Sequence, residues 1–231
     1  MTKSVVLFSS GIDSTTALYW ALARYEKVYP LTFDYGQRHR VEIRMARRLG
    51  KKLRLSHFLL KIDLRQIGGS ALTDSTIPLP QYERLAEIKE DIPPTYVPFR
   101  NGIFLALAAA WSESKGLREI ICGFNVIDSP CYPDTRFKFV KAMEEAIKAG
   151  TKASSAGERI RIIAPFINKK KAEIIKEGIS LGADYSYSIS CYRGEEIPCQ
   201  KCSSCLLRQK AWKEVGLPDP LLLRLEKEGR L

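Results

Sequence analysis

The chain has 231 residues, of which 45% are hydrophobic, so it is long enough for one folded domain and too apolar to be disordered. Its 37 Lys and Arg against 26 Asp and Glu give a formal net charge of +11, which favours anionic partners such as nucleotides, although a basic solvated surface has the same composition. No apolar run approaches the roughly 20 residues of a membrane span. No signal-peptide pattern precedes Val5, so we expect a cytoplasmic protein without a membrane partner.

Strand-like apolar runs alternate with helix-like amphipathic runs along the chain. The predicted strands are Ser4–Phe8, Val28–Phe33, Lys52–Leu60, Glu119–Phe124 and Arg159–Phe166. The predicted helices are Asp13–Arg24, Arg40–Gly50, Asn101–Ser114, Thr135–Gly150 and Lys169–Gly182, the last two capped by Asp134 and Asn168. This alternation predicts an α/β fold with a doubly wound, parallel five-stranded sheet covered on both faces by helices. Residues 63–98 are rich in Pro, Ser, Thr and Gly and are too long for an idle connection, so we expect a functional loop or a lid.

The loop S-S-G-I-D-S-T, Ser9–Thr15, joins the first predicted strand to the first predicted helix. Ligands of open parallel sheets bind beyond the carboxyl ends of the strands, where the N–H groups and dipole of the next helix attract anions. Gly11 permits a sharp turn, and four hydroxyl side chains add donors: Ser9, Ser10, Ser14 and Thr15. The loop therefore predicts a phosphate site that lacks both the Walker lysine and the dinucleotide glycine pattern. Asp13 would repel phosphate unless it binds Mg²⁺ or caps the helix, and a capped helix after a tight turn is the alternative explanation.

Four of the six cysteines fall within fifteen residues, in the pattern C-x7-C-x2-C-x2-C: Cys191, Cys199, Cys202 and Cys205. Zinc prefers four thiolates in a tetrahedron, and the short spacings let a tight turn present successive sulfurs to one ion. A structural zinc site is the prediction, with an iron–sulfur cluster or a redox disulfide as the alternatives. Cys122 lies in a predicted strand and should be a core residue, and Cys131 has no activating base nearby in the sequence, so we do not expect a nucleophile there.

Further polar motifs follow strands or precede helices, namely F-D-Y-G-Q-R-H (Phe33–His39), Y-V-P-F-R-N (Tyr96–Asn101), G-F-N-V-I-D-S-P-C-Y-P-D-T-R (Gly123–Arg136) and A-P-F-I-N-K-K-K-A-E-I-I (Ala164–Ile175). In this order, together with S-S-G-I-D-S and the S-C-Y and cysteine motifs, they resemble the 7-cyano-7-deazaguanine synthase family of PP-loop ATP pyrophosphatases. The resemblance covers the chain from Val5 to about Arg208. It implies ATP-dependent conversion of 7-carboxy-7-deazaguanine and ammonia to 7-cyano-7-deazaguanine, a precursor of queuosine and archaeosine. Such enzymes work through adenylated intermediates and release AMP and pyrophosphate.

The resemblance also implies which residues bind which ligand. ATP and Mg²⁺ would be bound by Phe8, Ser9, Ser10, Gly11, Asp13, Ser14, Thr15, Asp34 and Arg100, with Asp13 and Lys171 in catalytic roles. The deazaguanine would be bound by Gln37, His39, Asn101, Asp128, Tyr132, Asp134 and Arg136. Each group also has a structural explanation, namely a solvated loop after the second strand, an ordinary helix start at Arg100, and a helix cap at Asp134. Lys169 and Lys170 are expected to be solvated, and His57 to be structural.

Four residues depart from the family pattern, because Ser10 and Cys131 replace glycine, Phe99 stands where glycine is frequent, and Thr135 replaces cysteine. They keep two alternatives open: another PP-loop enzyme, such as a tRNA-thiolating enzyme or an amidotransferase, or an inactive, zinc-stabilised nucleotide-binding paralogue. We expect residues 1–185 to form the PP-loop nucleotide-binding domain and residues 186–231 a zinc-binding element packed on it. The apolar stretch Leu217–Leu225 would be buried on its own domain or in a homodimer, and a nucleic-acid partner is not expected.

Overall fold

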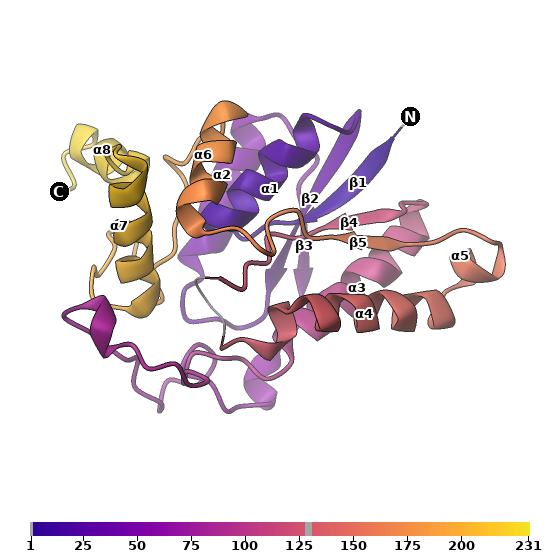
Figure 1. Cartoon of the computed structure of the whole chain (residues 1–231), viewed down its shortest axis with the longest axis horizontal. Helices are drawn as coiled ribbons and strands as arrows, with labels where there is room; N and C mark the ends of the chain where they lie inside the picture. The colour runs from indigo at the N-terminus through magenta and orange to yellow at the C-terminus, as the bar shows by residue number, and fades with distance from the viewer. Residues whose placement is uncertain (1, 128–130) are drawn as a thin grey trace.

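A computed structural model describes residues 2–127 and 131–231, and Figure 1 shows a central sheet between two layers of helices. The five strands are β1 (Lys3–Leu7), β2 (Lys27–Asp34), β3 (Phe58–Lys61), β4 (Glu119–Ile121) and β5 (Arg161–Ile163). They are all parallel and lie in the order β3-β2-β1-β4-β5. In the central strand, Val5 pairs with Tyr29 of β2 and Ile120 of β4. The predicted parallel five-stranded sheet is confirmed.

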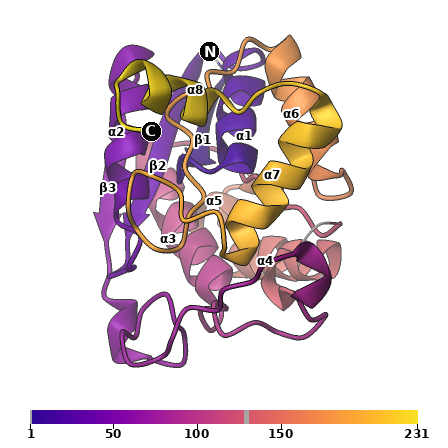
Figure 2. The same cartoon turned by 90° about the vertical axis from the view of Figure 1, so that its left-hand side faces the viewer.

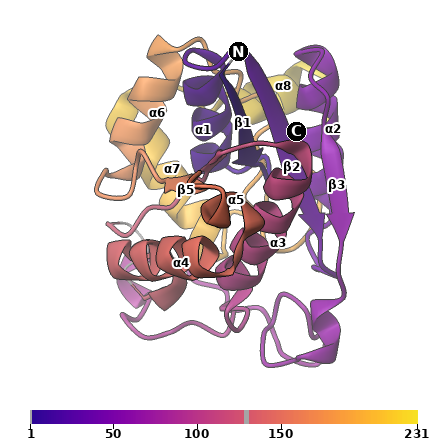
Figure 3. The same cartoon turned by 90° about the vertical axis from the view of Figure 1, so that its right-hand side faces the viewer.

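Helices cover both faces because successive residues of a strand point to opposite sides of the sheet. On one face, Val5 belongs to a buried cluster with residues of α3 (Arg100–Lys115) and α4 (Phe137–Gly150). On the other face, Val6 packs with residues of α1 (Ile12–Leu22), α2 (Val41–Lys52) and α6 (Lys171–Ser180). Figure 3 shows these two helical layers on opposite sides of the strands. The connections carry the short helix α5 (Lys152–Ser155) and three 3₁₀ turns, η1 (Leu64–Gln66), η2 (Leu85–Glu87) and η3 (Pro133–Thr135).

The chain reverses its winding direction between β1 and β4, because β2 and β3 lie on one side of β1 and β4 and β5 on the other. Loops that follow strands at such a switch point diverge and leave a crevice at the carboxyl edge of the sheet. Gly123 follows β4 and packs against the first turn of α1, where a Cβ on Gly123 would lie 2.7 Å from the backbone carbonyl carbon of Asp13. Only glycine permits this approach, which brings the loops after β1 and β4 to the same crevice.

The C-terminal element consists of α7 (Ser203–Val215) and α8 (Pro220–Lys227), which pack beside α6 and α2. Leu221 and Leu225 of α8 are fully buried in a cluster with Met45 of α2. The domain itself therefore buries Leu221 and Leu225 of the apolar stretch, whereas Leu217 and Leu223 are exposed. Arg208 of α7 is also buried and donates to the Asp219 carboxylate, with a shortest distance of 2.5 Å.

The long segment 63–98 is held by backbone hydrogen bonds to distant parts of the chain. Leu72 accepts from the Arg38 N–H at 2.8 Å, and Tyr82 donates to the Lys201 carbonyl beside the cysteines at 2.8 Å. Figure 2 shows the segment crossing beneath α3 and reaching α7. Two of its residues, Leu72 and Thr95, line the crevice. Among the described residues, none of the helices has the length and apolarity that crossing a membrane requires.

The start of β3 differs from the prediction because of close packing at Gly50. This glycine lies inside α2 rather than at its end, and β3 begins at Phe58 rather than Lys52. A Cβ at Gly50 would approach the His57 ring to 3.2 Å, so the glycine serves helix-to-strand packing.

Two predicted helix caps are also wrong. Lys170, not Asn168, precedes α6, where the Glu173 carboxylate accepts from the Lys170 N–H at 2.7 Å. Asp134 does not cap α4, because its carboxylate accepts from the Asn101 N–H at 3.0 Å and so caps α3. The contact joins elements that are remote in the sequence, which is why local spacing misassigned it.

Candidate active site and cysteine cluster

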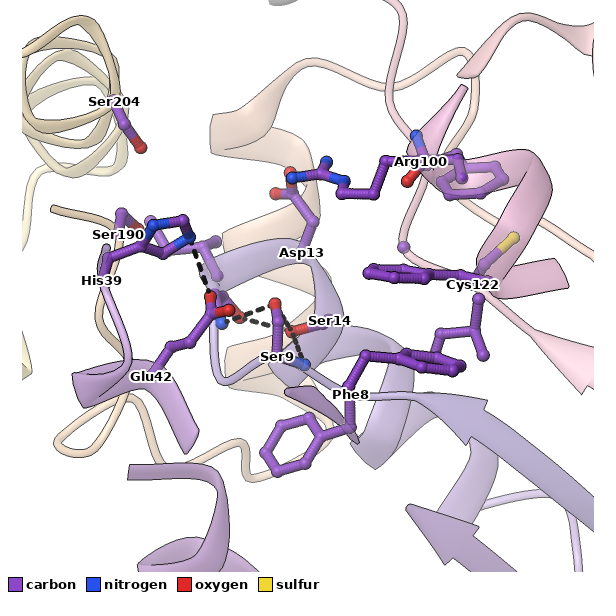
Figure 4. A pocket seen from close by; sticks show the side chains of 18 of the residues that line it. Phe8, Ser9, Asp13, Ser14, His39, Glu42, Arg100, Cys122, Ser190 and Ser204 are labelled. Atoms are coloured by element: carbon purple, nitrogen blue, oxygen red, sulfur yellow. Dashed lines mark hydrogen bonds and ion pairs between the residues drawn. The ribbon is translucent and has the colours of Figure 1, made fainter. Parts of the chain in front are cut away.

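A cavity of about 310 Å³ opens at the carboxyl edge of the sheet, in the crevice between the loops after β1 and β4. Side chains from several elements face it, as Figure 4 shows. The residues predicted for binding that line it are Phe8, Ser9, Gly11, Asp13, Ser14, His39, Arg100, Asn101, Tyr132 and Lys171. The structure therefore brings together residues that lie up to 163 positions apart in the chain, namely Phe8 and Lys171. This is the geometry of a binding site that the fold assembles from several strand ends.

The loop after β1 is held in shape by its own hydroxyls. The Oγ atoms of Ser9 and Ser14 lie 3.2 Å apart, and the Gly11 N–H donates to Ser9 Oγ at 3.4 Å. Ser10 is buried in a left-handed conformation with φ 63°, and its Oγ donates to the Tyr187 carbonyl at 2.7 Å. The Ser10 side chain therefore faces away from the cavity, contrary to its predicted role as a phosphate donor.

Asp13 and Lys171 form an ion pair inside the cavity. The Lys171 Nζ lies 2.6 and 2.9 Å from the two carboxylate oxygens of Asp13, and both side chains are largely buried. Asp13 lies in the first turn of α1, where the helix dipole stabilises a carboxylate. The pair places a cation suited to phosphate and a carboxylate suited to a divalent metal at the mouth of an anion-binding helix terminus.

Aromatic side chains and a guanidinium form another part of the cavity wall. Arg100 donates to the Tyr35 hydroxyl at 3.3 Å, and its guanidinium lies 5.9 Å from the centre of the Phe104 ring. The Tyr132 and Thr95 hydroxyl oxygens lie 3.1 Å apart, and this hydrogen bond holds the Tyr132 ring at the cavity edge. Flat rings next to polar groups suit a planar heteroaromatic ligand such as a purine.

A buried acid that sequence reasoning missed also lines the cavity. Glu42, in the first turn of α2, accepts from Gln37 Nε2 at 2.8 Å and lies 3.5 Å from His39 Nε2. Burial raises the pKa of Glu42 to about 7 and lowers the pKa of His39 to about 3, so the imidazole is neutral. An acidic residue in the first turn of a helix is normally explained by its favourable interaction with the helix dipole. Only its neighbours Val41 and Ile43, which are both buried, indicate that Glu42 points inward.

Six of the predicted binding residues that the structure describes do not line the cavity: Ser10, discussed above, and Thr15, Asp34, Gln37, Asp134 and Arg136. Thr15 is fully buried, and Asp34 pairs with Arg40 at 2.5 Å at the end of β2. The Gln37 side-chain amide is occupied by the tight turn after β2: its oxygen accepts from the Tyr35 N–H at 2.8 Å, and its nitrogen donates to Glu42.

The remaining two belong to helix starts. Asp134 caps α3, and Arg136 is exposed at the start of α4. The predicted substrate contact Asp128 lies outside the described residues.

The four clustered cysteines converge on one point. Their sulfur atoms all lie within 4.8 Å of one another, which fits a zinc tetrahedron whose sulfurs, at about 2.3 Å from the ion, would be about 3.8 Å apart. Backbone N–H groups of Cys199 and Cys202 donate to the sulfurs of Cys191 and Cys199 at 3.3 and 3.4 Å, as is typical of thiolates held for a metal. Hydrogen bonds from the Cys202 and Cys205 thiols lower the pKa of Cys191. The donor set and spacing could hold zinc.

This cluster adjoins the cavity through the backbone. Cys191 lies between Ser190 and Tyr192, and all three residues line the cavity. Arg208 donates to the Ser190 hydroxyl at 3.4 Å, and this hydrogen bond links α7 to the segment that contains Ser190, Cys191 and Tyr192. A metal held by the cysteines would therefore fix one wall of the site.

Comparison with known proteins identifies the family. The family profile described as "Queuosine biosynthesis protein QueC" matches residues 3–216. The chain is 45% identical over 221 residues to the 7-cyano-7-deazaguanine synthase of Nostoc punctiforme, which covers 95% of this chain and 99% of the relative. It is 45% identical over 219 residues to that of Thermoplasma volcanium, covering 95% and 90% of the two chains. The chain belongs to the 7-cyano-7-deazaguanine synthase family.

Among solved structures, the 4-thiouridine synthetase of an RNA complex with bound ATP aligns with a TM-score of 0.51 and 21% identity. The alignment covers 97% of this chain and 53% of that one, so this chain spans about half of that larger protein. The likeness shows a shared fold.

Two departures from the synthase family pattern now have a common structural feature. Ser10 and Phe99 both stand where the pattern has or favours glycine, and both have left-handed backbones, with φ values of 63° and 52°. Glycine enters this region without steric cost, whereas other residues do so at about 1 kcal/mol or more. Ser10 has a compensating hydrogen bond to Tyr187, whereas the Phe99 side chain is mostly exposed.

Proposed function

We propose that the protein is an ATP-dependent carbon–nitrogen ligase that converts 7-carboxy-7-deazaguanine and ammonia to 7-cyano-7-deazaguanine. The observation that carries the proposal is the identity of about 45% to 7-cyano-7-deazaguanine synthases over nearly the full length of both chains. The cavity supports it, because the N-terminus of α1 and an aromatic wall with a guanidinium adjoin the same cavity. A carboxylated planar base and a triphosphate can thus be held side by side.

The chain's own residues account for the activation of the substrate carboxylate. We propose that the loop Ser9–Ser14 and the N-terminus of α1 bind the phosphates, while Lys171 neutralises charge on the departing pyrophosphate. Asp13 would hold a Mg²⁺ ion, which when bound supplies further charge neutralisation on the phosphates. Arg100 would orient the substrate carboxylate or the α-phosphate by two parallel hydrogen bonds.

The reaction needs no nucleophilic side chain. A carboxylate oxygen is a poor leaving group. Transfer of the adenylyl group of ATP to this oxygen releases pyrophosphate and makes the oxygen displaceable as AMP, so that ammonia can form the amide. A second adenylation, on the amide oxygen, allows loss of AMP and formation of the nitrile. Of the two cysteines that line the cavity, Cys191 belongs to the cysteine cluster, and Cys122 lies beside β4; burial raises the pKa of the Cys122 thiol, so it remains protonated and inert.

A pyrophosphate-release assay with ATP, 7-carboxy-7-deazaguanine and ammonium tests the proposal. We expect release that depends on the base, and a loss of about 100-fold or more in Lys171→Met. Lys169→Met is the matched control, because Lys169 pairs with Glu177 and does not line the cavity. ATP binding without release on any substrate would identify an inactive paralogue, and release only with tRNA would identify a thiolating enzyme.

The cysteine cluster has its own test. We propose that it holds a structural zinc ion that fixes Ser190 and Tyr192 in the cavity wall. Cys202→Ser should lower the zinc content and the melting temperature, and weaken binding of the base more than binding of ATP. A metal-free wild-type protein with the same stability would contradict the proposal.

A further inference from the structure

Glu42 is held in the cavity in one orientation. Its Oε1 accepts from Gln37 Nε2 at 2.8 Å, and Gln37 is fixed in turn by the Tyr35 N–H and the Phe33 carbonyl. Its Oε2 faces His39 Nε2 at 3.5 Å. The turn after β2 and the first turn of α2 therefore hold a carboxylate oxygen in place on the cavity wall.

One polar atom, His39 Nε2, faces this oxygen directly, and the Tyr35 hydroxyl faces the same nitrogen. The Tyr35 hydroxyl lies 3.5 Å from His39 Nε2, and His39 Nε2 lies 3.5 Å from Glu42 Oε2. These separations are at the limit of hydrogen bonding. His39 is only 7% exposed, and its Nδ1 has no partner among the described residues. Figure 4 shows His39 and Glu42 together on the side of the cavity that carries Ser9.

We propose that the polar atoms of Glu42, His39 and Tyr35 bind ammonium. Glu42 then accepts a proton from it, which delivers ammonia to the adenylated substrate. The inference rests on the proposed function, because that reaction consumes ammonia. Ammonia is mostly protonated at neutral pH, and an ammonium ion is bound by oxygens and neutral nitrogens that accept N–H bonds. Arg100 and Lys171 can only donate, and Asp13 is engaged by Lys171, whereas Glu42 faces a neutral imidazole.

The proton and bond changes balance. One proton moves from the ammonium nitrogen to Glu42 Oε2, and the freed lone pair forms the C–N bond as the bond to the AMP oxygen breaks. The nitrogen then loses its second proton to the departing AMP, leaving a neutral amide, and Glu42 returns its proton to solvent. Burial raises the pKa of Glu42 to about 7, with Gln37, His39, Tyr35 and Arg100 around it, so its basicity suits a transfer at neutral pH.

Glu42→Gln separates this step from adenylation. Without ammonium, first-turnover pyrophosphate release should stay within about threefold of the wild type, while kcat/KM for ammonium should fall by about 100-fold. Hydroxylamine is a nucleophile that is largely neutral at neutral pH and needs no base. Its rate with Glu42→Gln should therefore stay within about threefold of the wild type.

Two outcomes would overturn the proposal. Equal losses with ammonium and hydroxylamine would mean that Glu42 only shapes the cavity, and loss of ammonium-independent release would mean that it binds ATP or the base. Glu214→Gln, an exposed pair partner of Lys210 on α7, is the matched control and should change neither rate. If Glu42→Gln does not fold, Glu42→Asp gives the same comparison, with a larger loss for ammonium than for hydroxylamine. Absence of pyrophosphate release in the wild type would instead refute the proposed function.

Discussion

Ser10 combines two opposing contributions to stability, which substitutions can separate. Its left-handed φ of 63° costs a residue with a Cβ about 1 kcal/mol relative to glycine. Its Oγ donates to the Tyr187 carbonyl at 2.7 Å, and such a buried hydrogen bond contributes about 1 kcal/mol. The two contributions nearly cancel, so Ser10→Gly should change the free energy of unfolding by less than about 1 kcal/mol.

Ser10→Ala keeps the backbone cost and removes the hydrogen bond, so the half-buried Tyr187 carbonyl loses its Ser10 partner. We expect this variant to be about 1–3 kcal/mol less stable than the wild type. Urea unfolding followed by tryptophan fluorescence measures both variants. Ser155→Ala, at an exposed serine of α5, is the control and should lie within about 0.5 kcal/mol of the wild type.

The ranking of the two variants decides whether this reasoning holds. An alanine variant as stable as the glycine variant would show that the hydrogen bond to Tyr187 contributes nothing. A glycine variant whose free energy of unfolding exceeds that of the wild type by more than about 2 kcal/mol would show that backbone strain dominates. Because the Ser10 side chain faces away from the cavity, both variants should retain the wild-type affinity for ATP within about threefold, provided that the loop keeps its shape.

Three further substitutions test the packing and electrostatics around the site. Arg208→Met leaves the buried Asp219 carboxylate without its cation and should lower the free energy of unfolding by about 3–5 kcal/mol in urea; a loss below about 1 kcal/mol would contradict this. Burial lowers the pKa of His57 to about 4, below its unfolded value of about 6.5, so the unfolded state binds more protons between these values and stability falls as the pH drops through that window. His57→Gln should show a shallower fall in melting temperature over that range, and an unchanged slope would exclude His57 as its source. Gly123→Ala should lose most ATP turnover because its Cβ would meet the α1 backbone at 2.7 Å, whereas Gly150→Ala, with open space around its Cβ, should behave as wild type.

Features set by chain alternation and strand ends were predictable from the sequence. Apolar runs separated by helical patterns lead to a parallel sheet, and the carboxyl ends of parallel strands meet at one edge. Residues of the loop and helix start that follow β1, such as Ser9 and Asp13, therefore line the cavity as expected. The convergence of the four cysteines was predictable for a different reason: the short spacings between them leave little choice of geometry.

Features that depend on contacts between remote segments were not predictable. Asp134 caps a helix that begins more than thirty residues earlier, and its local spacing pointed to the wrong helix. Gln37 turns inward to satisfy the tight turn after β2, and this in turn places Glu42 in the cavity. Ser10 has a left-handed backbone, and its side chain contacts Tyr187, which is 177 residues away in the chain.

The most direct test of the central claim is the stoichiometry of the complete reaction. Purified protein is incubated with ATP, ammonium and 7-carboxy-7-deazaguanine, and AMP, ADP, pyrophosphate and the nitrile are quantified together. Two successive adenylations in one cavity predict two AMP and two pyrophosphate molecules for each 7-cyano-7-deazaguanine, with no ADP. Formation of ADP and phosphate, or of AMP without any nitrile, would contradict adenylation of this base as the function of the site.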